Sequence, residues 1–375
     1  MMNKRNHNRT IKRCIVKIGS ALITQNGTGL DQHAIYSWTK QIADIKAQGT
    51  EIILVSSGSI AEGMCRMGWQ QRPTNLCELQ AAAAIGQAGL IQTYQQSFAE
   101  FQLQTAQVLL THDDLRDRRR YLNARSTLKT LLELNAVPIV NENDTISFKE
   151  IRLGDNDTLS ALVANLVDAD LLIILTDQQG LYNKDPRHHA DAQFISEDSA
   201  TNPALLDYAG GAGTTVGTGG MRTKVLAAQK AALSGCSTLI ASGREPNVLT
   251  RLFAEENLGT LLTADCEPLA ARKQWIANQL NTKGQLTLDN GAITALKDAG
   301  RSLLPIGTTS VNGIFERGDI IDCLNTQDHL IARGLVNYSS EECEQILGVA
   351  SRDIEKKLGY IDTPELIHRD NLVIL

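Results

Sequence analysis

The stretch that decides the fold runs from Val137 to Ala161 and has the sequence VPIVNENDTISFKEIRLGDNDTLSA. It begins as an apolar run typical of a buried strand and ends as a segment that can begin a helix. Between these parts lie acids and amides, namely Asn141, Glu142, Asn143, Asp144, Asp155, Asn156 and Asp157. Polar groups are costly to bury at the end of an apolar strand unless they meet a partner or a ligand. The stretch therefore predicts a ligand site at the carboxyl end of a buried strand.

Strands and helices alternate on both sides of this stretch. Apolar runs predict strands over residues 11–18, 51–56, 106–110, 137–140, 171–175, 237–241 and 259–263, and helices over about 31–48, 77–98, 221–234 and 246–256. Ser59-x-x-Glu62 is a capping-box pattern expected to begin another helix, and Thr145–Arg152 has the alternation of a small hairpin. This order predicts an α/β domain, a three-layer αβα sandwich with a mainly parallel sheet.

The sequence pattern changes after about Asn281, where short strands separated by glycines predict a small β-rich domain. From residue 281 onward the chain has nine Lys or Arg and fourteen Asp or Glu, so this part carries -5 of the formal charge of -6. We expect a catalytic domain over residues 1–265, a linker over 266–280 and the β-rich domain over 281–375.

Composition narrows the class of protein. The chain has 42 acidic and 36 basic residues, whereas general nucleic-acid-binding proteins carry a basic excess. No apolar run is long enough for a membrane span, and the polar N-terminus lacks the apolar block of a signal peptide. The seven cysteines are scattered and form no C-x-x-C pair, as expected of reduced thiols in a cytoplasmic protein.

Two lysines are candidates for binding phosphate. The sequence lacks the Walker pattern, and no G-x-G-x-x-G follows a strand. However, the segment Gly217–Lys224 (GTGGMRTK) combines free backbone N–H groups, a helix start and a lysine, which are the parts of an anion site. Lys17 ends an apolar strand beside Gly19. The alternative for Gly217–Lys224 is an ordinary flexible loop, and the alternative for Lys17 is a lysine that extends from a strand edge into solvent.

The acids and amides suggest separate roles. Asp157 is either a helix cap or the carboxylate that holds the two lysines by charge pairing. Ser57 and Gly58 at a helix start suit a carboxylate ligand, the alternative being a plain N-cap. Asp144 suits an ammonium group, the alternative being a solvated acid in a hairpin. His188 and His189 have no partner at metal-ligand spacing, so we assign no metal site.

Several motifs, in order, resemble the amino-acid kinase family, and within it the kinases that act on L-glutamate. They are KIGS (17–20), VSSGSIAEG (55–63), QAAAAIGQAGL (80–90), YLNAR (121–125), NENDT (141–145), GDNDTLSA (154–161), LLIILTDQQGLYNKDPR (171–187) and GTGGMRTK (217–224). The segments 300–321, 331–340 and 366–373 resemble a PUA domain. Leu153 and Ser59 depart from residues common in the family, and neither position has a proposed charged role.

The resemblance implies ATP-dependent phosphorylation of the side-chain carboxylate of L-glutamate, giving L-glutamyl 5-phosphate in the first step of proline biosynthesis, with Mg²⁺ carried on ATP. It implies catalytic roles for Lys17, Lys224 and Asp157, with Asp155 as a nearby support. ATP would contact Lys17, Thr176, Asp177, Thr218, Gly219, Gly220, Met221, Arg222, Thr223 and Lys224, and glutamate would contact Ser57, Asp144 and Asn156. It also implies feedback inhibition by proline and a homo-oligomer formed through the kinase domain.

Two alternatives remain open at this point. One is a related kinase acting on N-acetylglutamate or aspartate; an acetylated substrate has no ammonium for Asp144. The other is an RNA-binding regulatory protein acting through the PUA domain, which the acidic balance of residues 281–375 disfavours because phosphate contacts need basic residues.

Overall fold

The structure of the chain is a computed structural model that describes residues 11–24, 29–146, 156–210, 220–265, 270, 273, 276–277 and 282–375. The chain divides into two compact units, Met1–Pro268 and Leu269–Leu375. The expected hairpin over Thr145–Arg152 and the expected linker over 266–280 lie mostly outside the described residues. The proposed domain boundaries therefore stay a prediction.

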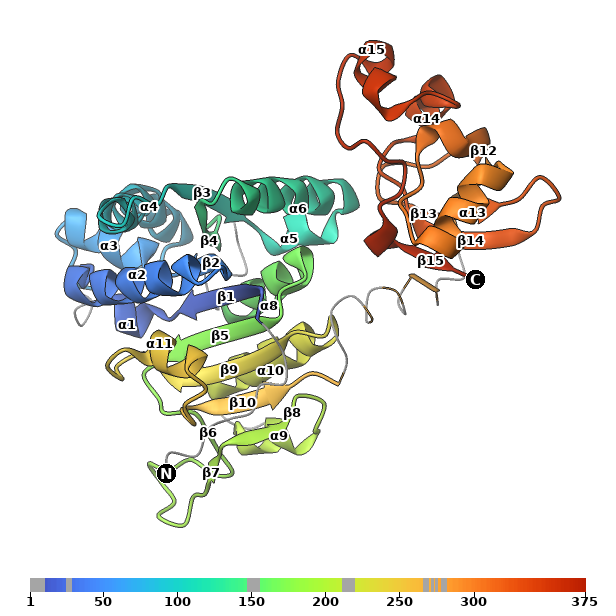
Figure 1. Ribbon diagram of the computed structural model, residues 1–375. Coiled ribbons are helices and arrows are strands. Elements are labelled where there is room, and N and C mark those ends of the chain that lie inside the picture. The colour runs from blue at the N-terminus through green and yellow to red at the C-terminus, as the bar shows by residue number, and fades with distance from the viewer. Residues whose placement is uncertain are drawn as a thin grey trace. The chain divides into compact units, whose positions relative to one another are not determined.

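The first unit is built on an eight-stranded sheet in the order β3-β4-β2-β1-β5-β9-β10-β8 (Figure 1). Neighbouring strands from β3 to β9 are parallel, and β10 runs antiparallel to β9. The strands are β1 (Arg13–Ile18), β2 (Glu51–Ser56), β3 (Thr105–Leu110), β4 (Val137–Glu142), β5 (Leu171–Thr176), β8 (Glu197–Ser199), β9 (Ser237–Ser242) and β10 (Thr260–Thr263). The mainly parallel sheet confirms the predicted fold class.

Helices cover both faces of this sheet (Figure 1). One face packs against α1 (Ser20–Ile23), α2 (Gln32–Ala47), α4 (Leu76–Ala99) and α11 (Val248–Phe253), and the other against α6 (Arg118–Glu133), α8 (Asn156–Val167) and α10 (Met221–Ala232). Because strand side chains alternate, Val16 packs toward α2 and α4 whereas Ile15 packs toward α8 and α10. Lys17 therefore lies on the α8 and α10 side of the sheet.

The remaining elements of this unit are short or peripheral. They are α3 (Ser59–Arg66), α5 (His112–Arg116), α9 (Ala204–Tyr208) and the two-stranded sheet of β6 (Leu181–Tyr182) and β7 (Phe194–Ile195). Helix α3 packs closely on α4, since a Cβ added at Gly63 would lie 1.8 Å from the carbonyl oxygen of Ala82. None of the helices in the described residues is long and apolar enough to cross a membrane.

The helix predicted to begin at Ser59 is confirmed, since α3 begins there, but the capping box itself does not form. Gly58 is the N-cap of α3, with φ +104°, and no side chain caps this helix. Ser59 therefore lies inside the first turn, where its hydroxyl donates to Asp144 at 3.0 Å, and Glu62 pairs with Arg66 instead. An N-cap residue normally has extended backbone, and the left-handed turn at Gly58 replaces that geometry.

The second unit is a small β-rich domain, as predicted. Its five-stranded sheet has the order β12-β11-β13-β14-β15. The strands are β11 (Gly284–Leu288), β12 (Thr308–Gly313), β13 (Ile320–Leu324), β14 (Leu330–Leu335) and β15 (Leu372–Ile374), and the helices are α13 (Asn290–Ala299), α14 (Ser340–Ile346) and α15 (Ile354–Leu358). A separate core that includes Phe315 and Tyr338 holds them together.

Candidate active site

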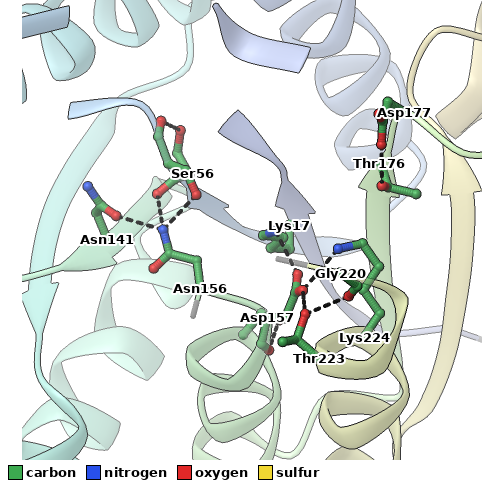
Figure 2. Close-up of polar contacts among 12 residues, drawn as sticks. Lys17, Ser56, Asn141, Asn156, Asp157, Thr176, Asp177, Gly220, Thr223 and Lys224 are labelled. Carbon is green, nitrogen blue, oxygen red and sulfur yellow. Dashed lines mark hydrogen bonds and ion pairs between the residues drawn. The ribbon is translucent and has the colours of Figure 1, made fainter. Parts of the chain in front are cut away.

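Polar side chains gather at the carboxyl ends of the central parallel strands (Figure 2). Lys17 lies near the end of β1, Ser56 ends β2, Asn141 lies near the end of β4 and Thr176 ends β5. Carboxyl ends of parallel strands meet at one edge of a sheet, where ligands of open α/β folds bind. Helices α8 and α10 begin at the same edge, so their first turns complete the site.

A buried carboxylate lies between two lysines at this edge (Figure 2). The Nζ of Lys17 is 2.6 Å from Oδ1 of Asp157, and the Nζ of Lys224 is 3.0 Å from Oδ2. The hydroxyl of Thr223 donates to the same Oδ2 at 2.6 Å. The three charged residues are at most 5% exposed, and together they carry one net positive charge. Such a cluster can attract and hold an anion.

The charges of this cluster depend on one another. Burial alone would raise the pKa of Asp157, but Lys17 and Lys224 outweigh that effect and hold the pKa well below its usual range. Burial lowers the pKa of Lys224, and the charge of Asp157 opposes this shift. Asp157 thus remains ionised and helps to keep Lys224 protonated.

A network of amides lies beside the lysine cluster. Nδ2 of Asn156 donates to the carbonyl oxygen of Ser56 at 3.1 Å, to Oγ of Ser57 at 2.7 Å and to Oδ1 of Asn141 at 3.0 Å. A carbonyl oxygen can only accept, so this contact fixes the orientation of the Asn156 amide. Oδ1 of Asn156 is buried and has no hydrogen-bond partner among the residues that the structure describes. It is an acceptor suited to a ligand donor.

Asp144 provides a second acceptor. It receives a hydrogen bond from the hydroxyl of Ser59 at 3.0 Å. Burial raises the pKa of Asp144 to about 6, and the nearby charge of Glu142 adds to the shift while Ser59 and Arg72 oppose it. A buried carboxylate with a raised pKa favours a cationic partner, because a positive charge stabilises its ionised form.

The residues expected to contact ATP lie around the same edge. Thr176 donates to Oδ1 of Asp177 at 3.1 Å, and the charge of Asp177 raises the pKa of Lys224 against the effect of burial. Gly220 precedes α10, and Met221 and Arg222 occupy its first turn. Thr218 and Gly219 of the glycine segment, and Asp155, lie outside the described residues. The nucleotide-binding roles of all these residues stay predictions.

Several contacts of the site could not be predicted from the sequence. Thr223 was predicted to contact ATP, and its hydroxyl also binds Asp157. No individual role was predicted for Asn141 or Ser56, which hold the Asn156 amide, or for Gln87, which binds Asn141. Asn141 lies in the NENDT motif and Gln87 in the QAAAAIGQAGL motif, but the bond between them joins residues 54 positions apart and depends on the fold. Within the described ranges no group of three or more His, Cys, Asp or Glu side chains could hold a metal ion.

Comparison with known proteins identifies the family of this chain over nearly its full length. Residues 12–242 match the Amino acid kinase family and residues 284–358 match the PUA domain. The chain is 58% identical over 364 residues to the Glutamate 5-kinase of Methylobacillus flagellatus, covering 97% of this chain and 98% of that protein. It is 59% identical to the Glutamate 5-kinase of Thioalkalivibrio sulfidiphilus, with 97% of each chain covered. It is 56% identical over 375 residues, 100% of both chains, to that of Nitrosococcus oceani. The chain therefore belongs to the amino-acid kinase family and, within it, to the glutamate 5-kinases.

Proposed function

We propose that the chain transfers the γ-phosphoryl group of ATP to the side-chain carboxylate of L-glutamate, producing L-glutamyl 5-phosphate in the first step of proline biosynthesis. The observation that carries this proposal is the buried Asp157 held between Lys17 and Lys224 at the edge of the sheet. Two cations fixed in this way suit the negative charge of a transferring phosphoryl group.

The reaction needs no general base. A carboxylate with a pKa of about 4.3 is already ionised at neutral pH, so the nucleophile is ready when it binds. An oxygen of the glutamate carboxylate attacks the γ-phosphorus in line, the bond from that phosphorus to the bridging oxygen breaks, and ADP leaves. The main difficulty is that one anion must approach another, and the net positive charge of the lysine cluster reduces their repulsion.

Lys17 and Lys224 would bind the transferring phosphoryl group, and Asp157 would hold both lysines in position. Thr176, Asp177 and the segment Thr218–Lys224 would hold the rest of ATP. The carboxylate of Asp157 is already occupied by two lysines and Thr223, so it does not suit a metal ion. Mg²⁺ carried on the ATP phosphates would neutralise further charge.

The amide network favours an amino acid with a free ammonium group. Oδ1 of Asn156 and the carboxylate of Asp144 are both acceptors, and an ammonium donates three hydrogen bonds. Ser57 and the first turn of α3 would receive the α-carboxylate. N-acetylglutamate lacks the ammonium charge and would leave Asp144 without a cationic partner, so the site favours glutamate.

Proline is the proposed feedback inhibitor. It shares an α-carboxylate and a cationic α-nitrogen with glutamate, so it would compete at Ser57, Asp144 and Asn156. Inhibition that no concentration of glutamate relieves would contradict this site. A homo-oligomer formed through the first unit is likewise a proposal, which light scattering of the purified protein would test.

The acceptor specificity tests the main proposal. The purified chain with ATP should release ADP when L-glutamate is added, and hydroxylamine should trap the acyl phosphate as a hydroxamate. N-acetylglutamate and aspartate should give little of either product. A preference for N-acetylglutamate or aspartate would refute the proposed substrate. Salt-sensitive retention of structured RNA together with absence of any acceptor-dependent ADP release would favour the RNA-binding alternative.

A further inference from the structure

Three amide side chains form a continuous row of hydrogen bonds from helix α4 to the amino-acid site. Nδ2 of Asn156 donates to Oδ1 of Asn141 at 3.0 Å (Figure 2), and Nδ2 of Asn141 donates to Oε1 of Gln87 at 2.8 Å. Asn141 is 1% exposed and Asn156 is 7% exposed. Gln87 lies on α4, and no role at the site has so far been assigned to it.

Backbone groups fix which amide atoms donate and which accept in this row of hydrogen bonds. The N–H of Glu142 donates to Oδ1 of Asn141 at 2.9 Å, and the carbonyl oxygen of Ser56 accepts from Nδ2 of Asn156. A backbone N–H only donates and a carbonyl only accepts, so both asparagine amides have a defined orientation. Gln87 must therefore present its oxygen to Asn141. At the other end of the row, the acceptor Oδ1 of Asn156 remains for a ligand.

Helix α4 is held firmly against the elements that carry the site. A Cβ added at Gly86 would lie 1.8 Å from the carbonyl oxygen of Ser59 and 2.3 Å from the backbone nitrogen of Gly63. The hydroxyl of Tyr94, also on α4, lies 3.0 Å from Oγ of Ser56 in a fully buried contact. The position of Gln87 relative to β2 and α3 is therefore fixed on both sides by direct contact.

We propose that Gln87 is a positioning residue that holds Asn141, and through it Asn156, where Oδ1 of Asn156 faces the substrate ammonium. Backbone groups set the orientation of both asparagine amides, and Oε1 of Gln87 supplies the acceptor for Nδ2 of Asn141. Without an acceptor at position 87, that Nδ2 becomes a buried donor that lacks a strong partner, and a buried unsatisfied donor is costly. The Asn141 side chain then shifts toward Oγ of Ser59, which lies 3.5 Å from Nδ2. This shift weakens the bond from Asn156 to Asn141 and displaces the Oδ1 of Asn156 that faces the substrate ammonium. This inference rests on the proposed function.

Gln87→Met tests the proposal, because methionine nearly keeps the shape of glutamine and removes the acceptor. The KM for glutamate should rise about tenfold, which corresponds to one lost hydrogen bond to a charged group. The kcat and the KM for ATP should stay within about twofold of the parent values. Gln87→Glu keeps an acceptor oxygen and should recover most of the glutamate affinity. Gln95→Met, at an exposed position of α4, is the matched control and should behave as the parent chain.

Different outcomes test the positioning role of Gln87 and the proposed kinase function. A glutamate KM within about twofold of the parent value in Gln87→Met overturns the positioning role, as does an equal loss for glutamate and ATP that Gln87→Glu fails to restore. If Gln87→Met does not fold, Gln87→Asn, which withdraws the amide by one methylene, replaces it with the same two outcomes. Absence of glutamate phosphorylation in the parent chain would instead refute the proposed function, and direct calorimetry of glutamate binding would then decide whether Gln87 affects affinity.

Discussion

Asp157→Asn removes the one negative charge between the two lysines while it keeps the shape of the side chain. Two unit charges about 4 Å apart interact by about 4 kcal/mol at an effective dielectric constant of 20. In the variant, Lys17 and Lys224 lose that attraction and repel each other in a nearly water-free site. We expect kcat to fall by about 10²- to 10³-fold, the range seen when a fixed electrostatic group is removed from an active site.

The same substitution changes the pH dependence. The charge of Asp157 raises the pKa of Lys224, so its removal lowers that pKa further and moves the alkaline limb of the activity profile to lower pH. The pKa of Asp157 in the folded chain lies below its ordinary value. Its contribution to stability is therefore present above the ordinary value of about 4 and is lost as the pH falls below it. Asp157→Asn should lack this acid-dependent loss.

The assay is glutamate-dependent ADP release across pH, together with thermal unfolding of each variant. Unfolding should stay cooperative, although breaking a buried ion pair lowers stability by about 3–5 kcal/mol. Asp168→Asn is the matched control, because Asp168 also binds two cations, Arg125 at 2.7 Å and Lys129 at 3.5 Å, at the far end of α8. It should retain near-normal turnover. Near-normal turnover in Asp157→Asn would refute the mechanism.

Lys224, Asp144 and Gly86 can each be tested by a single substitution. Lys224→Ala should lose most turnover while unfolding stays cooperative, because only one lysine then faces the transferring group; near-normal turnover would contradict its role. The KM for glutamate should rise as the pH falls below about 6, since the pKa of Asp144 is raised to about 6 by burial and a protonated carboxyl no longer attracts an ammonium. Asp144→Asn should raise this KM at every pH and flatten the dependence, whereas an unchanged slope would exclude Asp144 from the site. Gly86→Ala should lower the free energy of unfolding by about 3 kcal/mol, because its Cβ would lie 1.8 Å from the carbonyl oxygen of Ser59. Gly291→Ala in α13, whose Cβ meets one side-chain oxygen at 3.3 Å, is the control and should leave stability nearly unchanged; equal effects of the two would refute the packing argument.

The sheet was predictable because its central strands are buried on both faces. All six residues of β5 are buried, which gives the continuous apolar run that the sequence contains. Helix α2 was predictable for a similar reason, since its apolar residues recur at helical spacing and Asp31 caps its first turn. Both features depend on residues that are close together in the sequence, so the sequence alone is enough to predict them.

The contacts of the site depend on residues that are distant in the chain. The charge pairing of Asp157 with Lys17 and Lys224 was a hypothesis drawn from their positions at strand and helix ends, and only the fold supplies the distances of 2.6 and 3.0 Å. At Ser59 the local pattern predicts a cap that does not form, because the left-handed turn at Gly58 and the position of Asp144 are set by tertiary packing. Gln87 lies in the QAAAAIGQAGL segment (80–90), but its contact with Asn141 depends on the fold.

The two halves of the site are joined at one peptide bond. Asn156 belongs to the amide network and Asp157 to the lysine cluster, and these two residues begin α8. Consecutive Cα atoms lie about 3.8 Å apart, so Asn156 and Asp157 have a nearly fixed separation. In the proposed reaction, Asn156 would hold the substrate ammonium and Asp157 would hold the lysines that bind the phosphoryl group. One rigid turn would then align both reactants, and alignment supplies much of the rate of such a transfer. Aspartate, shorter by one methylene, would bind its ammonium at Asn156 and leave its carboxylate short of the lysines, so we expect the first turn of α8 to select the length of the substrate.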